Sequence, residues 1–154
     1  MNYKLATLED INQFIELRIL EQINDWNAKY PVTEEFKNKT KEAFSKMLGK
    51  ELYLFIAVEK KQIVATAGLL IQQYLPQMDD YSGRRGYLCN VFTLPDFRRQ
   101  GIQKKLMKEL IDYAKNSLNL SRIDLHSSLS PEVYQMYEKF GFQFVQNNAR
   151  LLLN

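Results

Sequence analysis

Apolar side chains recur at helical spacing in the first third of the chain. Residues 7–23 carry them at this period after Thr7, which can cap a helix together with Asp10 three positions later. Residues 33–49 begin with a threonine and two glutamates and end with a glycine, which suit the two ends of a second helix. Residues 3–6 are a short strand candidate. The front of the chain is therefore predicted to fold as strand, helix, helix.

The middle of the chain has the β-branched and aromatic composition of strands. Residues 52–58 and 63–72 are two such runs around a polar turn at 59–62, which predicts an antiparallel hairpin. Residues 73–85 contain proline, glycine, serine and aspartates, and we expect them to form a loop. Residues 86–93 are predicted to be the next strand.

The last third of the chain alternates helices with strands. An amphipathic helix begins near Ile102, a short strand covers 122–126, and a helix covers 131–141 with a proline in its first turn. Residues 142–145 and 149–153 are expected to be the final strands. An antiparallel front half joined to a strand–helix–strand crossover predicts an α/β fold with a mixed sheet and helices on both faces.

The composition is typical of one globular domain. The chain has 154 residues, of which 45% are hydrophobic and 25% charged, without a repeat or linker, so we expect a single domain over residues 1–154. A dispersed net charge of +3 does not indicate nucleic-acid binding. One cysteine and one histidine argue against a disulfide and a transition-metal site. The lack of a signal-peptide pattern and of a long apolar run predicts a cytoplasmic protein without a membrane partner.

One strand-to-helix junction has the features of a phosphate-binding site. The loop over residues 98–101 leads directly into the helix near Ile102, where unpaired amides and the helix dipole attract anions. Gly101 lets an anion approach the backbone closely, and Arg98 and Arg99 offer forked donors. A solvated basic turn that needs a glycine for its conformation explains the same residues, and the loop alone favours that plainer interpretation.

A longer pattern around this loop changes the balance. The run over residues 90–107 resembles motif A of the GNAT acetyltransferases, whose core is Arg/Gln-x-x-Gly-x-Gly/Ala. Arg98 and Gly101 match its first two defined positions. Gln103 stands at the third, where the family usually has glycine or alanine, so the strength of cofactor binding is the point that this departure puts in question.

Three further patterns resemble the same family. Val91 and Pro95 match its Val-x-x-x-Pro approach to motif A. Residues 136–142, Met-Tyr-Glu-Lys-Phe-Gly-Phe, are similar to the family's Leu-Tyr-Glu-Lys-x-Gly-Phe signature, and residues 6–11 with 17–18 are similar to many GNAT N-termini. The resemblance covers essentially the whole chain and agrees with the predicted order of elements.

The resemblance implies the GNAT fold and acetyl-CoA as the cofactor, with CoA as a product. The fold is a mixed, mostly antiparallel sheet with a central splayed parallel pair, here residues 86–93 and 122–126. The backbone from Val91 to Thr93 would pair with the pantetheine arm, and the 98–104 loop and helix start would hold the pyrophosphate. The implied cofactor-binding residues are Val91, Phe92, Thr93, Arg98, Arg99, Gln100, Gly101, Ile102, Gln103, Lys104 and, for the pantetheine or sulfur, Ser130.

The resemblance implies that Tyr137 protonates the leaving thiolate. A phenol suits this role because its ordinary pKa of about 10 keeps it protonated at neutral pH. Tyr137 also lies three positions after Tyr134, a spacing that fits a packing stripe in the core.

The base that accepts the amine's proton is less determined. The strand before motif A holds Tyr87, Cys89 and Asn90 in place of the carboxylate that GNAT enzymes often have there. His126, at the end of its strand, is a second catalytic candidate as the base. Further candidates, each of which also fits an ordinary surface carboxylate, are Asp79, Asp80 and Glu21.

The resemblance therefore implies an N-acetyltransferase that moves an acetyl group from acetyl-CoA to a primary amine of a small molecule or protein by direct transfer in a ternary complex. The alternative is a non-catalytic acyl-CoA-binding or regulatory GNAT module, which the missing strand carboxylate and Gln103 motivate. A third class would use the basic patch over residues 98–105 to bind nucleic acid or protein. The acceptor amine and a homodimer, which is common in the family, stay open.

Overall fold

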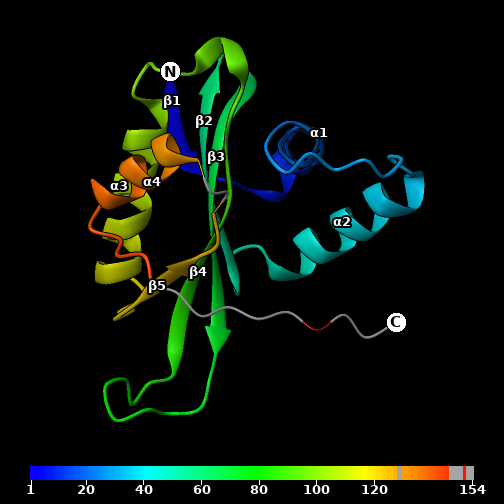
Figure 1. Cartoon of the computed structure of the whole chain (residues 1–154). Coiled ribbons are helices and arrows are strands. Elements are labelled where there is room, and N and C mark those ends of the chain that lie inside the picture. Colours follow the sequence, from blue (N-terminus) through cyan, green and yellow to red (C-terminus); the bar gives the residue numbers. More distant parts are fainter. Residues whose placement is uncertain (128–129, 146–150, 152–154) are drawn as a thin grey trace.

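The computed structural model describes residues 1–127, 130–145 and 151. Its sheet has five strands in the order β1-β2-β3-β4-β5, of which the first four are antiparallel and β4 and β5 are parallel (Figure 1). The strands are β1 Asn2–Leu5, β2 Leu52–Glu59, β3 Gln62–Gln73, β4 Arg84–Thr93 and β5 Ile123–Leu125. The predicted fold class is confirmed, and the parallel pair occupies one edge of the described sheet.

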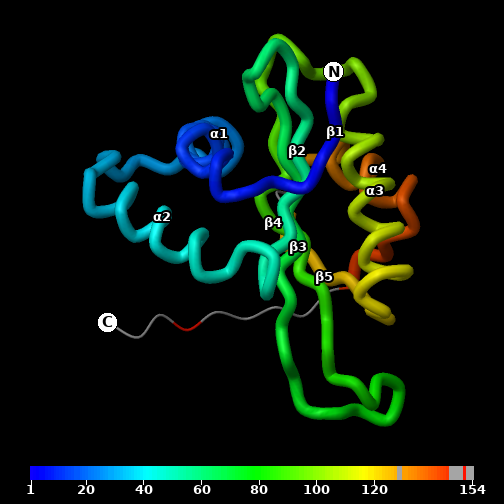
Figure 2. The backbone as a smooth tube through the Cα atoms, turned by 180° about the vertical axis from the view of Figure 1, so that it is seen from behind, coloured from blue at the N-terminus to red at the C-terminus, as the bar shows by residue number. Residues whose placement is uncertain are grey.

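Two helices cover each face of the sheet. Helices α1 and α2 pack on one face and α3 and α4 on the other, as the views from both sides show (Figures 1 and 2). They are α1 Ile11–Asn24, α2 Glu34–Met47, α3 Ile102–Asn116 and α4 Pro131–Glu138. Leu54 and Ile56 of β2 point into the α1–α2 core, whereas Phe55 and Ala57 point into the α3–α4 core. Because both faces of β2 are covered, its sequence is an almost continuous apolar run.

The end of the chain differs from the sequence prediction. Residues 142–145 were expected to form a strand, but the structure has none there. The ring of Phe142 packs edge-on against Tyr137 and that of Phe144 against Tyr134, with centroid distances of 5.7 and 4.1 Å. These aromatic contacts hold the segment against α4 and keep it from pairing with the sheet. The strand predicted over 149–153 lies outside the described residues except for Leu151, which belongs to no element.

The parallel pair of strands separates after a short pairing. β4 and β5 pair only from Gly86 with Ile123 to Leu88 with Leu125, although β4 continues to Thr93. Within this continuation β4 carries a bulge, because Thr66 pairs with Phe92 while Gly68 pairs with Cys89. The predicted splay is present, and the β4 segment from 89 to 93 faces an opening on its β5 side.

Asn90 lies in the β4 bulge and adopts a left-handed backbone conformation, with φ of 49°. The buried hydroxyl of Thr66 on β3 donates to the Asn90 carbonyl at 2.7 Å. A left-handed asparagine costs less than most other side chains would. The bulge therefore has a defined shape that β3 holds in place.

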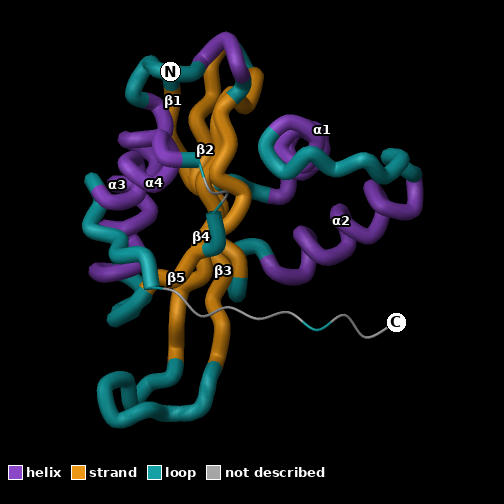
Figure 3. Tube along the Cα trace, viewed as in Figure 1, coloured by secondary structure: helices purple, strands orange, loops and turns teal. Residues whose placement is uncertain are grey.

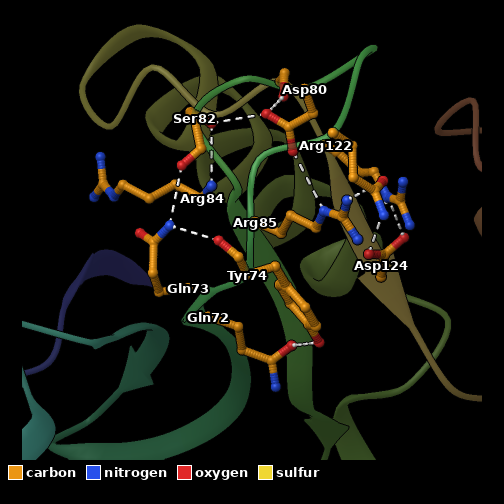
Figure 4. Close-up of polar contacts among 11 residues, drawn as sticks. Gln72, Gln73, Tyr74, Asp80, Ser82, Arg84, Arg85, Arg122 and Asp124 are labelled. Atoms are coloured by element: carbon orange, nitrogen blue, oxygen red, sulfur yellow. Dashed lines mark hydrogen bonds and ion pairs between the residues drawn. The ribbon is translucent and has the colours of Figure 1, made fainter.

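The β3–β4 hairpin extends well beyond the rest of the sheet (Figure 3). The turn at its end is shorter than the predicted 73–85 loop, since β3 reaches Gln73 and β4 begins at Arg84. A buried ion pair between Asp80 and Arg85, 3.3 Å apart, fastens the turn, and Ser82 donates to Asp80 at 2.8 Å (Figure 4). In the part of the chain that the structure describes, no helix has the length and apolar character needed to cross a membrane.

Candidate active site

A cavity of about 1140 Å³ lies between the second half of β4, the end of α1, the start of α3 and α4. Ten of the predicted site residues line it: Val91, Thr93, Arg98, Arg99, Gly101, Ile102, Gln103, Lys104, His126 and Tyr137. Three are not among its described lining residues. The Phe92 side chain is buried in the α1–α2 core, Gln100 donates to the Asp96 carbonyl at 3.0 Å, and Ser130 lies at the N-cap of α4.

The start of α3 presents backbone amides to this cavity. Gly101 is the N-cap residue, with φ of 76°, and the Lys105 N–H donates to its carbonyl at 3.2 Å. The amides before Lys105 have no intrahelical acceptor, because the first turn of an α-helix offers none. A Cβ on Gly101 would meet no atom within 4 Å, so the space before the turn is open. With exposed Arg99 and Lys104 beside it, the turn has the amides, charge and space for a phosphate group.

Arg98 connects the end of β4 to the end of α1. Its Nε donates to the Thr93 carbonyl at 3.0 Å, and its guanidinium lies 3.3 Å from a carboxylate oxygen of Asp25. Arg98, the first defined position of motif A, thus fixes the loop that leads from β4 to α3. It keeps a positive charge on the cavity wall at the same time.

The side chain of Gln103 points towards the sheet. Its Oε1 accepts from the Thr93 hydroxyl at 3.0 Å, and its Nε2 donates to the Thr66 carbonyl at 3.3 Å. The glutamine therefore links α3 to β3 and β4 beside the bulge. The sequence put cofactor binding in question at this position, yet the orientation of the side chain leaves the first turn of α3 uncovered.

Tyr137 combines the two interpretations that its sequence context allowed. It is buried in the α3–α4 core, with 7% of its surface exposed, and it also lines the cavity. Burial, with the charges of Glu21 and Asp25, raises the pKa of Tyr137 to about 12. Within the described residues its hydroxyl makes no hydrogen bond. The hydroxyl is also not fully buried. The hydroxyl therefore opens onto the cavity as a protonated donor.

Glu21 is a buried carboxylate that the fold brings to the cavity. Its side chain is buried, with 6% exposed, and it accepts a hydrogen bond from the Asn90 amide at 2.9 Å. Burial raises the pKa of Glu21, and Asn90, Arg18 and Trp26 only partly oppose this effect. A buried carboxylate with a raised pKa in a cavity is a candidate for proton transfer. A sequence signal exists, because Glu21 follows Phe14 and Leu17 on the apolar face of α1.

The remaining base candidates lie in different places. His126 is exposed on the cavity wall, with its Nδ1 2.9 Å from the Tyr87 hydroxyl. Asp80 is paired with Arg85 in the hairpin, and neither Asp79 nor Asp80 is among the described lining residues. Cys89 lines the cavity, but burial raises the pKa of its thiol to about 12, which disfavours a thiolate nucleophile.

The C-terminal half of α1 runs alongside the second half of β4 and gives the cavity a direction. Along this direction the charge of Arg18 lowers the pKa of Cys89, Glu21 accepts a hydrogen bond from Asn90, and Asp25 pairs with Arg98 just after the end of β4. The α3 turn at Gly101 lies at the Arg98 end. Arg18 lies towards the opposite end, near Cys89, and Glu21 lies between Arg18 and Asp25 along the helix.

Residues 17–142 match the model of the acetyltransferase (GNAT) family. The chain belongs to the GNAT family. Its members transfer acetyl groups, and the matched residues include the α3 turn, Glu21 and Tyr137. The resemblance inferred from the two sequence motifs is thereby confirmed.

Solved structures of similar proteins agree with this assignment. A predicted acetyltransferase from Clostridium acetobutylicum, in a crystal structure with acetyl-CoA, is 28% identical, with a TM-score of 0.86 over 98% of this GNAT chain and 95% of that one. Glucosamine-6-phosphate N-acetyltransferase from Arabidopsis thaliana is 23% identical, with a TM-score of 0.73 over the whole of both chains. A transcriptional regulator from Bacillus halodurans is 20% identical, with a TM-score of 0.79 over 99% of each chain. The last two show the fold alone.

Proposed function

We propose that the chain is an acetyl-CoA-dependent N-acetyltransferase that acetylates a primary amine directly in a ternary complex. The observation that carries this proposal is one cavity that joins the α3 turn at Gly101 to a phenol, Tyr137, and a buried carboxylate, Glu21. An anion site, a proton donor and a proton acceptor are the groups that transfer from a thioester to an amine requires.

The described residues fit acetyl-CoA, which supplies an acetyl group activated as a thioester. The free amides and open space at Gly101 suit the pyrophosphate, and Arg99 and Lys104 add positive charge. Beyond Leu88 the backbone of β4 has no described partner on the β5 side, so it can pair with the extended amides of pantetheine. The similarity to the Clostridium acetobutylicum protein, whose structure is with acetyl-CoA, supports the same cofactor.

Glu21 is proposed as the group that accepts the proton of the amine. An aliphatic amine has a pKa of about 10.4 and attacks only as the neutral form, so its proton needs an acceptor. The amine attacks as the neutral form, after its ammonium proton has gone to solvent. As the carbon–nitrogen bond forms and the carbon–sulfur bond breaks, one N–H proton goes to a Glu21 oxygen and the phenol proton of Tyr137 goes to the leaving sulfur. Proton exchange with solvent then returns Glu21 to the carboxylate and Tyr137 to the phenol. Glu21 stands ahead of His126 because it is buried, fixed by Asn90 and placed midway along the cavity.

The acid and the base influence each other. The negative charge of Glu21 is one cause of the raised pKa of Tyr137. A proton on Glu21 removes this charge and therefore lowers the pKa of Tyr137. The phenol thus becomes a stronger acid when the amine has lost its proton, which is the stage at which the sulfur needs one.

Calorimetric titration with acetyl-CoA tests the cofactor site. We expect micromolar affinity, about −8 kcal/mol. Gly101→Glu places a carboxylate in the phosphate space and should abolish binding. Gly49→Glu is a matched control, because Gly49 also has a left-handed φ of 75° and no atom within 4 Å of its Cβ position, at a distance from the cavity lining.

Thiol release with a panel of primary amines then tests transfer. Release that depends on both acetyl-CoA and amine, without an acetylated protein, supports direct transfer. Binding without release on any amine would replace the enzyme with an acyl-CoA-binding module. Loss of binding in both glycine variants would attribute the Gly101 effect to backbone strain rather than to phosphate contact.

A further inference from the structure

The end of the cavity opposite the phosphate turn carries a positive charge, whereas a polycationic acceptor would need a negative one. Arg18, on α1, lines this end and is only half buried. The carboxylates among the described lining residues are Glu21 and Asp25, and both lie further along α1, towards the α3 turn. Beyond Glu21 the wall therefore presents the cation of Arg18, close enough to Cys89 to act on its thiol.

Arg18 has no counter-charge in direct contact. Within the described residues its guanidinium makes no ion pair or hydrogen bond, whereas Arg98 and Arg85 each have a carboxylate at 3.3 Å. The positive charge of Arg18 acts at a distance instead, and it lowers the pKa of Glu21 and of the Cys89 thiol against the larger effect of their burial. An arginine that lines a cavity without a partner can offer its planar set of donors to a carboxylate or phosphate.

Arg18 and Glu21 lie on the same face of α1. Residues three apart on a helix have Cβ atoms about 5–6 Å from each other. The pair thus presents a cation and a carboxylate at a separation that a small molecule with an amine and an anionic group a few bonds apart can match. Glu21 would then face the amine while Arg18 faces the anion, and the acetyl donor would reach the amine from the other side.

We infer that the acceptor is a small primary amine that also carries a carboxylate or phosphate, which Arg18 binds. This inference rests on the proposed function, because it uses Glu21 as the partner of the amine. It distinguishes this chain from an enzyme for polyamines or unmodified lysine side chains. Arg18 would repel the second cation of a polyamine and would make no favourable interaction with a neutral chain.

A panel of short amines tests the inference by thiol release. Propylamine carries no second charge, β-alanine a carboxylate, phosphoethanolamine a phosphate and 1,3-diaminopropane a second cation. We expect kcat/KM for at least one anionic amine to exceed that for propylamine about tenfold or more, with the diamine lowest. The two anionic amines distinguish a carboxylate site from a phosphate site.

Variants of Arg18 decide whether this residue is the cause. Arg18→Gln should reduce the ratio of anionic amine to propylamine to about one, Arg18→Lys should restore part of it, and Arg84→Gln, outside the cavity, should leave it unchanged. An equal loss for every acceptor in Arg18→Gln would mean that Arg18 only compensates the charge of Glu21, and it would overturn the inference. A wild-type preference for propylamine or the diamine would also overturn it.

Equilibrium binding separates this inference from the proposed function. The same amines are titrated into wild-type protein and Arg18→Gln by calorimetry, with and without CoA. If no amine is turned over, the proposed function fails, and selective binding of the anionic amines that Arg18→Gln removes still supports the anion site. Binding that is absent, or unchanged in the variant, sinks the anion site whatever the turnover.

Discussion

Glu21 and Asp80 are carboxylates of similarly low exposure that the fold treats in opposite ways. Their exposed fractions are 6% and 8%. Asp80, in the hairpin turn, accepts from Ser82 and pairs with Arg85, and these partners hold its pKa below the ordinary value (Figure 4). Glu21, in the cavity, has neutral hydrogen-bond donors, Asn90 and Trp26, and burial raises its pKa. Similar exposure therefore says little about the pKa of a carboxylate until its depth in the protein and its partners are known.

The difference reflects what each region is for. The hairpin extends away from the sheet, and its polar groups bind one another: Gln73 donates to the Tyr74 and Ser82 carbonyls, and Arg85 donates to Gln77. In the cavity, by contrast, Tyr137 and Arg18 keep donors that no described residue uses. Paired charges hold a loop in shape, whereas polar groups left without partners at a cavity are available to a ligand.

Replacing Glu21 should have the largest effect and sharpen this contrast. Glu21→Gln keeps the oxygen that faces Asn90 but cannot accept a proton, so we expect kcat/KM to fall about 10³-fold. The same variant should be more stable at pH 7 by roughly 1 kcal/mol, because it removes a buried charge. Thiol release and thermal unfolding measure the two effects, with Glu16→Gln on the exposed face of α1 as the control.

The sign of the pH dependence follows from the raised pKa of Glu21. Its burial costs nothing below the unfolded-state pKa of about 4.3, where the carboxyl is neutral in both states, and the cost grows as pH rises through the folded pKa. The stability gain of Glu21→Gln should therefore disappear near pH 4. A variant that loses stability at pH 7 would show that Glu21, like Asp80, is a structural carboxylate.

Tyr137→Phe is the second test of the cavity. It removes the proposed donor while it keeps the ring that packs against Phe142, so kcat should fall about 100-fold with little change in Tm. Tyr134→Phe, on the same helix and outside the described cavity lining, is the control. Because the pKa of Tyr137 is about 12, wild-type kcat should show no loss of this acid up to pH 10. Unchanged kcat in Tyr137→Phe would leave the tyrosine as a core aromatic.

Much of the fold could be predicted because local patterns determine it. The apolar run of β2 and the helical stripe after Thr7 produced the elements that the structure has. The turn of the hairpin was predicted too long, because Arg84 and Arg85 look like loop residues until Asp80 is seen beside Arg85. The strand predicted over residues 142–145 was wrong for a similar reason. Their alternating aromatic residues suit a strand, but in the structure their rings pack against α4.

The site residues divide in the same way, into those with a local sequence signal and those without one. Motif A and Tyr137 are local signals and could be found in the sequence. Glu21 was one carboxylate among several, because its meeting with Asn90 joins residues 69 positions apart. Arg18 gave no signal of its own, since the lack of a partner is visible only once the cavity is assembled. Whether a polar side chain belongs to the site or only lies on the surface depends on contacts between distant segments, which a local sequence pattern does not show.

Asp80→Asn tests the other side of the comparison. It leaves Arg85 buried without its counter-charge, so we expect Tm to fall by roughly 5–10 °C while kcat/KM at 25 °C stays unchanged. Because the pKa of Asp80 is lowered, its contribution is complete above an unfolded pKa of about 4 and is lost as pH falls through the folded value. The Tm difference should therefore shrink in acid. Asp79→Asn, at the exposed neighbour, is the control, and a loss of activity in Asp80→Asn would contradict the division.

Gln103 lies between the two kinds of region, since it touches the cavity while both ends of its amide are occupied. Gln103→Ala removes the bonds to Thr93 and Thr66 and introduces a residue that is usual for motif A. We expect a loss of about 1 kcal/mol in stability, measured by urea unfolding, and an acetyl-CoA Kd within about threefold of wild type by calorimetry. If affinity instead falls as far as in Gly101→Glu, the side chain binds the cofactor directly. If stability does not change, the link between α3 and the bulge contributes nothing to the fold. Both results as expected would make Gln103 a structural residue within a functional motif, for the same reason as Asp80: its polar groups already have their partners.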